Sequence, residues 1–334
     1  MISVLPTPVW LRRFTKVVAV STLFLIFAGA MVTSTGSGLA VPDWPLSYGM
    51  FLPPMIGGIL YETGHRLIAG SVGFLILLQA LALQFFEPKK FVRKLGWLSL
   101  GCVLVQGLLG GLTVLFLQPH ALSVAHGAVA EILLCLNVSI AFSTAAAGEK
   151  VPLRLRSGQA PADEGVRRLT TALPILVYSQ ILLGAIVRHM NAGVVFPDFP
   201  LSNGKLIPDF TSGAIVANFA HRAGALAVTI AILAVARACF RAKRFRGFAA
   251  ALVALVGCQI YLGMRVVFDY ADNKALYHSL VGQAALHHAS ITSMHVVTGA
   301  ATLATSLLLA LSARSERRTT SQVVAPVMAQ ELAA

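Results

Sequence analysis

The chain has 334 residues, of which 57% are hydrophobic and only 12% charged, and its mean hydropathy is +0.78. A soluble domain carries roughly 25% charged residues, so this composition excludes a soluble enzyme, a disordered chain and a disulfide scaffold. An excess of 26 Lys and Arg over 13 Asp and Glu suggests nucleic acid in a soluble protein. Inner loops of membrane proteins collect the same excess, so we expect a lipid bilayer as partner and no nucleic acid.

Eight apolar runs follow one another, each long enough to cross a hydrocarbon layer of about 30 Å as a helix. They cover residues 15–34, 66–86, 95–117, 121–143, 170–188, 214–236, 247–268 and 287–312. Basic residues gather before the first run, after the eighth, and between runs two and three, four and five, and six and seven. The positive-inside rule therefore predicts a multi-pass protein of the cell (inner) membrane with both termini cytoplasmic.

The first apolar run has a competing interpretation, because Ala28-Gly29-Ala30 resembles the small-residue site of a cleaved signal peptide. We favour a retained helix, since cleavage would destroy an internal repeat. Residues 38–49 (GLAVPDWPLSYG) return as residues 193–204 (GVVFPDFPLSNG) at a constant offset of 155. His65-Arg66 also returns as His221-Arg222, at an offset of 156.

The repeat predicts the fold class, an all-α integral membrane protein with eight transmembrane helices arranged as two four-helix bundles. Four is an even number, so the halves share an orientation and are related by a pseudo-two-fold axis along the membrane normal. The predicted parts are an N-terminal half (1–146), a polar cytoplasmic linker (147–168), a C-terminal half (169–313) and a cytoplasmic tail (314–334).

The repeated Pro-Asp-aromatic-Pro-Leu-Ser segment lies on the outer side of the membrane in both halves. Two prolines that flank an aromatic residue cannot sustain a helix, so a rigid, partly apolar loop is expected. This loop is either a plain structural cap or a lid over a site near the outer surface, with Trp44 and Phe199 dipping towards the bilayer interface.

Four histidines lie at matched depth, near the outer ends of the even-numbered helices. They pair within the halves as His65 with His126 and His221 with His295. A lone histidine on an apolar helix is usually a core residue, but four that obey a repeat indicate metal ligands. Two imidazoles from facing helices suit axial ligation of a heme iron.

Zinc is disfavoured, because each half offers two histidines where zinc takes three or four protein ligands. The cysteines have no metal-site spacing and are expected to be small packing residues; they are Cys102, Cys135, Cys239 and Cys258. Arg66 and Arg222 each follow a histidine, where they could pair with heme propionates. Their alternative role is snorkelling to lipid headgroups.

The halves differ beside these histidines. Glu62 precedes His65 by three residues, so both project from one helix face, and the equivalent residue of the second half is Asn218. An ionisable group at membrane depth is by default a functional hypothesis. We predict the N-terminal half as the reactive site, with Glu62 as catalytic residue, and the C-terminal half as a bis-His electron-transfer heme. Glu131 faces elsewhere, and a structural hydrogen bond is expected for it.

These features resemble the heme A synthase family over roughly residues 15–312, through the duplicated plan, the motif Glu62-Thr63-Gly64-His65-Arg66, the loop 42–46 and the four histidines. The resemblance implies oxidation of the C8 methyl of heme O to the formyl group of heme A by successive hydroxylations. Oxygen then comes from water, and electrons pass to an acceptor. The resemblance also implies that Glu62 acts beside a heme O flanked by His65 and His126, while His221 and His295 bind heme b.

The chain departs from this family pattern in two places. Val41 and Ser47 stand near positions where some members carry a loop cysteine pair, so that disulfide is absent here. The stretch before the last helix is longer than its counterpart and contains His278, His287 and His288. His288 precedes His295 by seven residues on the same face and competes as the ligand. We favour His295, because the residues after it continue directly into the apolar helix.

Two other functions stay open, and the first of them uses the same histidines. A diheme b-type cytochrome that oxidises a quinone needs no Glu62, and a heme transporter or assembly factor suits repeats about a membrane axis. Neither explains the Glu62/Asn218 difference, so we predict a heme A synthase-type oxidoreductase with heme b as cofactor. Its expected partners are heme O, heme O synthase and an electron acceptor of unknown identity, and a homo-oligomer is left open.

Overall fold

The computed structural model describes residues 6–145, 164–272 and 283–331. These ranges form eight helices that are long and apolar enough to cross a membrane. The helices are α1 (Val9–Ser34), α2 (Gly57–Phe86), α3 (Lys90–Leu115), α4 (His120–Ala145), α5 (Glu164–His189), α6 (Gly213–Arg241), α7 (Arg246–Asp272) and α9 (Gln283–Glu331). The prediction of an all-α, multi-pass membrane fold is thus confirmed for the described part of the chain.

Two helices extend beyond their apolar runs. Helix α2 begins at Gly57, well before the run at 66–86, so Glu62 and His65 lie inside a regular helix. Helix α9 continues to Glu331, into the stretch predicted as a tail, although its membrane-spanning part is Leu286–Ser315. Hydropathy marks the lipid-facing part of a helix, whereas backbone hydrogen bonds continue past the bilayer boundary.

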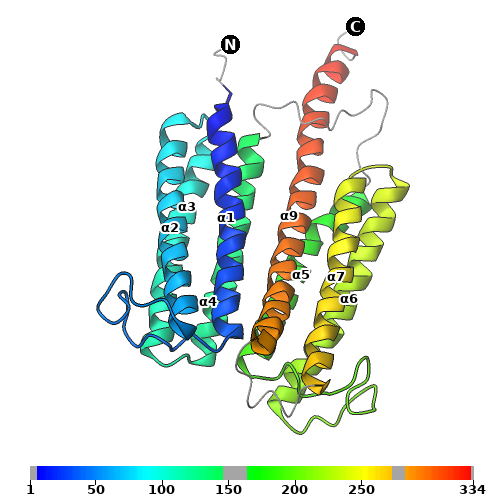
Figure 1. Ribbon diagram of the computed structural model, residues 1–334. Coiled ribbons are helices and arrows are strands. Elements are labelled where there is room, and N and C mark those ends of the chain that lie inside the picture. Colours follow the sequence, from blue (N-terminus) through cyan, green and yellow to red (C-terminus); the bar gives the residue numbers. More distant parts are fainter. Residues whose placement is uncertain (1–5, 146–163, 273–282, 332–334) are drawn as a thin grey trace.

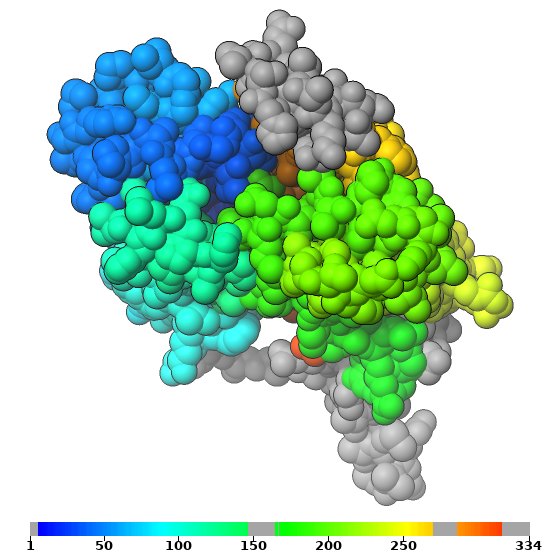
Figure 2. All heavy atoms as spheres, turned by 90° about the horizontal axis from the view of Figure 1, so that it is seen from below, coloured from blue at the N-terminus to red at the C-terminus, as the bar shows by residue number. Residues whose placement is uncertain are grey.

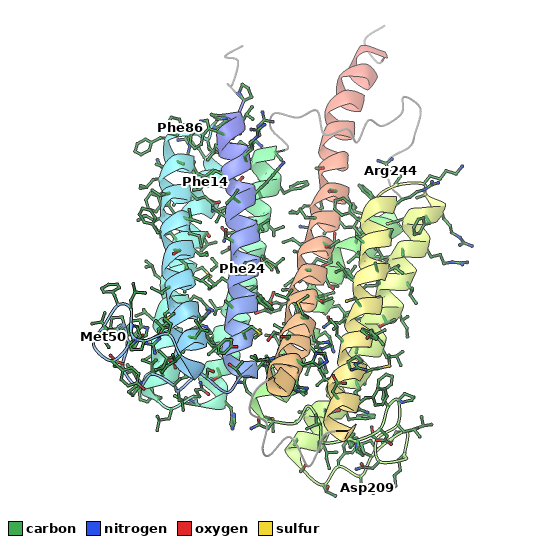
Figure 3. All side chains as sticks on the ribbon, in the orientation of Figure 1. Phe14, Phe24, Met50, Phe86, Asp209 and Arg244 are labelled. Carbon is green, nitrogen blue, oxygen red and sulfur yellow. The ribbon has the colours of Figure 1, made fainter. Side chains whose placement is uncertain are left out.

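The two ends of the molecule are distinct. Helix α1 starts and α9 finishes at one end, and the two long loops, 35–56 and 190–212, lie at the other (Figure 1). Figure 3 shows Met50 and Asp209 at this loop end and Phe86 and Arg244 at the opposite end. We call the latter the basic end, because the short connections α2–α3 and α6–α7 carry their lysines and arginines there.

The helices of each half contact one another in a closed ring. In the N-terminal half α1 contacts α2, α2 contacts α3, α3 contacts α4, and α4 contacts α1. The C-terminal half repeats this order as α5, α6, α7 and α9. Consequently α2 lies diagonally opposite α4, and α6 lies diagonally opposite α9. These diagonal pairs are the helices that carry the four histidines.

Between the halves, α1 contacts α9, α4 contacts α5, and α4 contacts α9. A two-fold axis that exchanges the halves pairs α1 with α5 and α4 with α9. It would therefore convert the α1–α9 contact into the α4–α5 contact and leave the α4–α9 contact unchanged. The pattern therefore supports the predicted pseudo-two-fold relation, which stays a prediction. Seen from the loop end, the blue-to-teal N-terminal half lies beside the green-to-yellow C-terminal half (Figure 2).

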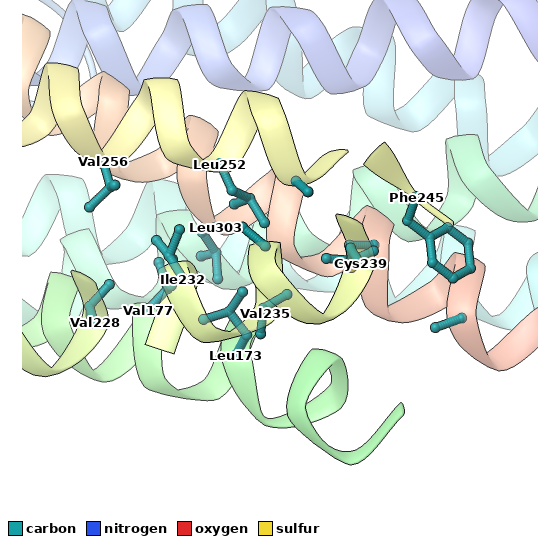
Figure 4. Packing of buried hydrophobic residues seen from close by; sticks show 14 residues of the cluster. Leu173, Val177, Val228, Ile232, Val235, Cys239, Phe245, Leu252, Val256 and Leu303 are labelled. Atoms are coloured by element: carbon teal, nitrogen blue, oxygen red, sulfur yellow. The ribbon is translucent and has the colours of Figure 1, made fainter. Parts of the chain in front are cut away.

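The outer surface is apolar: Phe74, Phe85 and Leu104 are 59%, 75% and 62% exposed. Such a belt suits lipid tails. The C-terminal half contains an apolar core, and Figure 4 shows Val177, Val235 and Leu252 among the side chains that form it.

The N-terminal half instead buries a polar cluster with one member from each of its four helices. Asn137 Oδ1 of α4 accepts hydrogen bonds from Gln79 Nε2 and Ser99 Oγ, both at 2.9 Å. Asn137 Nδ2 donates to Thr22 Oγ1 at 3.1 Å. Hydrogen bonds between apolar helices hold membrane bundles together, so this half is joined through Asn137 rather than by apolar packing alone.

Candidate functional site

Each of the four predicted ligand histidines packs its ring against a glycine of a neighbouring helix. A Cβ added at that glycine would lie 3.0 to 3.2 Å from the ring Cε1 atom, a tight contact that the ring would have to relieve by shifting a few tenths of an ångström. The pairs are His65 with Gly29, His126 with Gly110, His221 with Gly184, and His295 with Gly263. The glycines line the space inside each bundle, where a larger residue would push the imidazole away.

The fold places the four histidines on two diagonal pairs of helices. His65 of α2 and His126 of α4 lie in the N-terminal half, and His221 of α6 and His295 of α9 lie in the C-terminal half. Each pair sits on diagonally opposite helices, so its rings face the bundle interior from two sides. This arrangement can hold a flat macrocycle with a metal at its centre.

Glutamines brace three of the four imidazoles. Gln106 and Gln259 place Nε2 3.3 Å from Nε2 of His126 and His295, and Gln180 places Nε2 3.0 Å from His221 Nδ1. Each glutamine lies four residues, about one helical turn, before the glycine that packs against the same histidine ring. The exception is His65, where Leu25 occupies the position of Gln180. No hydrogen bond joins the His65 ring to another described side chain.

The donor set fits a porphyrin iron. Nδ1 of His65, His126 and His295 is buried without a hydrogen-bond partner among the described residues. A buried, unpaired ring nitrogen is costly unless a ligand satisfies it, and either imidazole nitrogen can bind a metal. Within the described residues no group of three or more His, Cys, Asp or Glu side chains could hold a metal ion, and paired histidines are what axial ligation requires.

His288, the competing ligand, lies on α9 one turn before Thr292, whose hydroxyl donates to the His288 carbonyl at 2.9 Å and lies 3.3 Å from its Nε2. Of the two histidines, it is the ring of His295 that packs against a glycine, Gly263, and lies 3.3 Å from the Nε2 atom of a glutamine, Gln259. We therefore keep His295 as the proposed ligand. His278 lies outside the described residues.

Glu62 is buried at 3% exposure and tied to the loop that precedes its helix. Its Oε2 accepts a hydrogen bond from Val41 N at 2.9 Å, and its Oε1 pairs with Arg66 Nη2 at 2.6 Å. Arg66 Nη1 donates to the carbonyl oxygens of Asp43 and Leu46 at 2.7 and 2.6 Å. The carboxylate and the guanidinium thus hold the loop over the site.

The C-terminal half keeps the arginine and changes the acid. Arg222 Nη1 donates to the carbonyls of Asp198 and Leu201 at 2.9 and 2.8 Å, as Arg66 does in its own half. Asn218 Nδ2 donates to the Ala192 carbonyl at 2.6 Å. As a result Arg222 Nη2 and Asn218 Oδ1 are buried with no partner among the described residues. This half has a spare cationic donor where the other half has an ion pair.

The two loops close in the same way. Asp43 accepts hydrogen bonds from the backbone N–H groups of Tyr48 and Gly49 at 2.7 and 2.8 Å, and Asp198 does so from Asn203 and Gly204. Tyr48 and Gly49 have φ of 53° and 69°, a left-handed pair typical of a tight hairpin turn. The N–H groups of Gly49 and Tyr48 hold the pKa of Asp43 below its usual 3.8.

The indole ring of Trp44, a residue of the first loop, packs against helix α3. A Cβ added at Gly111 would come within 2.6 Å of Trp44 Cδ2, so the indole rests on a glycine next to the one that cradles His126. The corresponding residue of α7 is Met264, and Phe199 instead lies 5.8 Å from the Arg222 guanidinium. The two aromatic residues thus have different contacts in the two halves, and the choice between a structural cap and a lid stays a prediction.

Other predicted features fall outside these sites. Glu131 is buried, and its Oε2 has no partner within the described ranges, so the structure shows no hydrogen bond at that oxygen. Cys239 packs in the apolar core of the C-terminal half. The glutamine braces were not predicted, although the repeat of Gln106 as Gln259 was a signal that could have found two of them.

A family model described as "Cytochrome oxidase assembly protein" (COX15-CtaA) matches residues 58–290. The chain is 32% identical over 261 residues to the heme A synthase of Symbiobacterium thermophilum, a match that covers 75% of this chain and 83% of the relative. It is 30% identical over 285 residues to the heme A synthase of Shouchella clausii, covering 81% and 92%. Because the family model matches more than half of the chain and relatives at least 30% identical are matched over most of their length, the chain belongs to the heme A synthase family of cytochrome oxidase assembly proteins.

Proposed function

We propose that this chain oxidises the C8 methyl of heme O to the formyl group of heme A. The methyl carbon gains an oxygen from water through successive hydroxylations, and electrons and protons leave in equal number. The protons need a base near the methyl group, and the electrons need an acceptor, whose identity is open. Relatives named heme A synthase support the reaction. The observation that carries it is the buried carboxylate of Glu62, one helical turn from His65, at a position where the second half has Asn218.

The difference between the pairs supports our assignment of the two porphyrins. His221 and His295 are both braced by glutamines, which suits a resident heme b that must keep one geometry. In the N-terminal half His126 is braced and His65 is not, which suits a substrate that must enter and leave. We therefore place heme O between His65 and His126. Heme b, when bound between His221 and His295, supplies one-electron redox chemistry.

Glu62 is proposed as the catalytic base or as the group that orients water. Its Val41 and Arg66 hydrogen bonds fix the carboxylate and leave little rotational freedom. Arg66, already engaged with Glu62 and two carbonyls, would act mainly by positioning that carboxylate. Arg222 has an unpartnered Nη2 and is the better candidate to bind a propionate of heme b.

The membrane placement is proposed as follows. The basic end, with its lysines and arginines, faces the cytoplasm, so that both termini are cytoplasmic and the histidine pairs lie towards the outer side. Heme O synthase would supply the substrate within the same bilayer. The alternative functions, a diheme electron-transfer cytochrome and a heme transporter or assembly factor, need no Glu62.

The test is pigment extraction from cells that express heme O synthase together with this chain. The wild-type protein should convert heme O to heme A, recognised by its formyl signature. Glu62→Gln should accumulate heme O while the protein still binds heme in the C-terminal half. Glu131→Gln is the matched control and should produce heme A normally. Heme A at the wild-type level from Glu62→Gln would remove Glu62 from the mechanism, and heme O alone from the wild type would favour the alternatives.

A further inference from the structure

A second cation lies beside the C-terminal histidine pair, on the helix face that contacts the ligand. Gln180, Gly184 and Arg188 follow one another at intervals of four residues on α5, so they share a face. Gln180 hydrogen-bonds His221, and Gly184 cradles its ring. Arg188 therefore lies one helical turn from the cradle, towards the loop end.

The N-terminal half has no such cation. The corresponding stripe on α1 is Leu25, Gly29 and Thr33. The glycine is the same in both halves, because the imidazole ring needs its space. Leu25 stands where the other half has the glutamine, and Thr33 stands where it has the arginine. Arg188 thus belongs to the features that distinguish the proposed heme b half from the proposed substrate half.

Arg188 is held in place from the other half of the molecule. Its Nη2 donates to the Ala30 carbonyl at 2.8 Å and to Ser34 Oγ at 2.7 Å. Ser34 Oγ in turn lies 2.9 Å from Ser293 Oγ on α9, two residues before His295. The guanidinium is therefore fixed where α1, α5 and α9 meet, which is not the free, lipid-directed arrangement of a snorkelling side chain.

The partners of Arg188 are neutral oxygens, so its charge is not compensated by them. None of the ion pairs among the described residues includes it. The hydrogen bonds to Ala30 and Ser34 both use Nη2, which leaves donors on Nε and Nη1. A fixed, uncompensated guanidinium in an apolar setting is a site for an anion, and carboxylates are its preferred partners.

We infer that Arg188 binds a propionate carboxylate of the porphyrin held between His221 and His295, with Ser34 and Ser293 positioning its guanidinium. The inference rests on the proposed heme b site. It adds a contact through which α1, a helix of the substrate half, fixes the porphyrin of the other half. A cation at this place also favours the reduced heme, because it offsets electron density gained at the iron.

The experiment compares Arg188→Gln and Arg188→Lys with Arg237→Gln, an exposed arginine of α6 used as the control. The purified proteins are assayed for heme b per chain, for the rate at which apomyoglobin removes the heme, and for the midpoint potential by redox titration. Arg188→Gln should release heme about tenfold faster, the factor expected for one charge-assisted hydrogen bond, and should lower the midpoint potential. Arg188→Lys should lie between, and Arg237→Gln should match the wild type.

Ser34→Ala tests the positioning role without removing the charge, and should show a smaller change in the same direction. Heme release and potential that are unchanged in Arg188→Gln would overturn the inference and leave the proposed reaction intact. A change only in copurified anionic lipid would also overturn it and assign Arg188 to a headgroup. Heme A at the wild-type level from Glu62→Gln would refute the proposed role of Glu62 and leave the heme release rate and midpoint potential of Arg188→Gln as the test of this inference, so the two proposals fail separately.

Discussion

Glu62 Oε1 and Arg66 Nη2 form an ion pair at 2.6 Å at the loop end of α2. At the same place in α6, Asn218 turns its amide to the backbone of the other loop, and Arg222 Nη2 is left without a partner among the described residues. One substitution therefore separates a half in which the arginine holds a carboxylate from a half in which the arginine can bind an anion from a ligand.

Replacing Asn218 by Glu should reverse this difference. The new carboxylate would pair with Arg222 Nη2, as Glu62 does with Arg66, and would repel a propionate that approaches the same donor. Heme b should dissociate from the variant about tenfold faster than from the wild type. The variant should therefore retain less heme b on purification. Asn218→Gln is the control, because it adds the same length without charge, and equal losses in both variants would refute the explanation.

Replacing Gly111 by Ala should impair the proposed oxidation through the first loop. Its Cβ would come within 2.6 Å of Trp44 Cδ2, so the indole and the loop must shift, and Val41 of that loop hydrogen-bonds Glu62. A displacement near 1 Å at a reacting group costs about ten- to a hundredfold in rate. The rate of heme A formation measures this effect. Gly107→Ala, on the same helix with nothing within 4 Å, should be neutral.

The brace at His221 can be converted to the arrangement at His65. Gln180→Leu removes the hydrogen bond to His221 Nδ1 and should alter the low-spin spectrum of the bound heme. Gly224→Ile alone should be poorly tolerated, because a Cβ there would lie 2.2 Å from Gln180 Oε1. In the N-terminal half the corresponding residues are Leu25 and Ile68, which pack in one apolar cluster. The double variant Gln180→Leu with Gly224→Ile reproduces this pair and should purify better than Gly224→Ile alone. A Gly224→Ile protein as stable as the double variant would contradict this packing account.

The polar cluster of the N-terminal half should contribute to its stability. Asn137→Leu leaves Gln79, Ser99 and Thr22 without their partner and should lower the free energy of unfolding by about 1–3 kcal/mol. Thermal unfolding in detergent measures the change. Ser306→Ala in α9, whose hydroxyl only bonds the Leu303 carbonyl of its own helix, is the control. A Tm unchanged in Asn137→Leu would mean that apolar packing alone holds this bundle.

The hairpin turn of the first loop should open in acid. The folded-state pKa of Asp43 lies below its usual 3.8 because the N–H groups of Gly49 and Tyr48 bind the carboxylate. This stabilisation is complete above the usual pKa and is lost as the pH falls through the lowered value. Amide exchange at Tyr48 and Gly49, corrected for intrinsic rates, should speed up in that acidic window. Asp43→Asn should show faster exchange at neutral pH, and slow, pH-independent exchange in the wild type would exclude the carboxylate.

The eight helices were predictable because their apolar runs exceed the bilayer thickness, and their order with the repeat placed the histidines on α2, α4, α6 and α9. The early start of α2 was not predictable, since Gly57 and its neighbours lack a lipid-facing run. The Arg66 bonds to Asp43 and Leu46 were missed because they depend on how the loop folds back, and the Gln180 brace was missed because Leu25 breaks the repeat at that position. The hydropathy of the sequence determines the length and order of the helices. Side-chain contacts such as those of Arg66 and Gln180 depend on how each helix is rotated about its axis.

The central claim assigns the substrate to the His65/His126 pair and heme b to the His221/His295 pair. Its most direct test is to extract and identify the pigments of two variants, His126→Met and His295→Met, purified from cells that also contain heme O synthase. The account predicts that His295→Met loses heme b and keeps heme O or heme A, while His126→Met keeps heme b and loses the other two. The opposite pattern would contradict the assignment of the two halves.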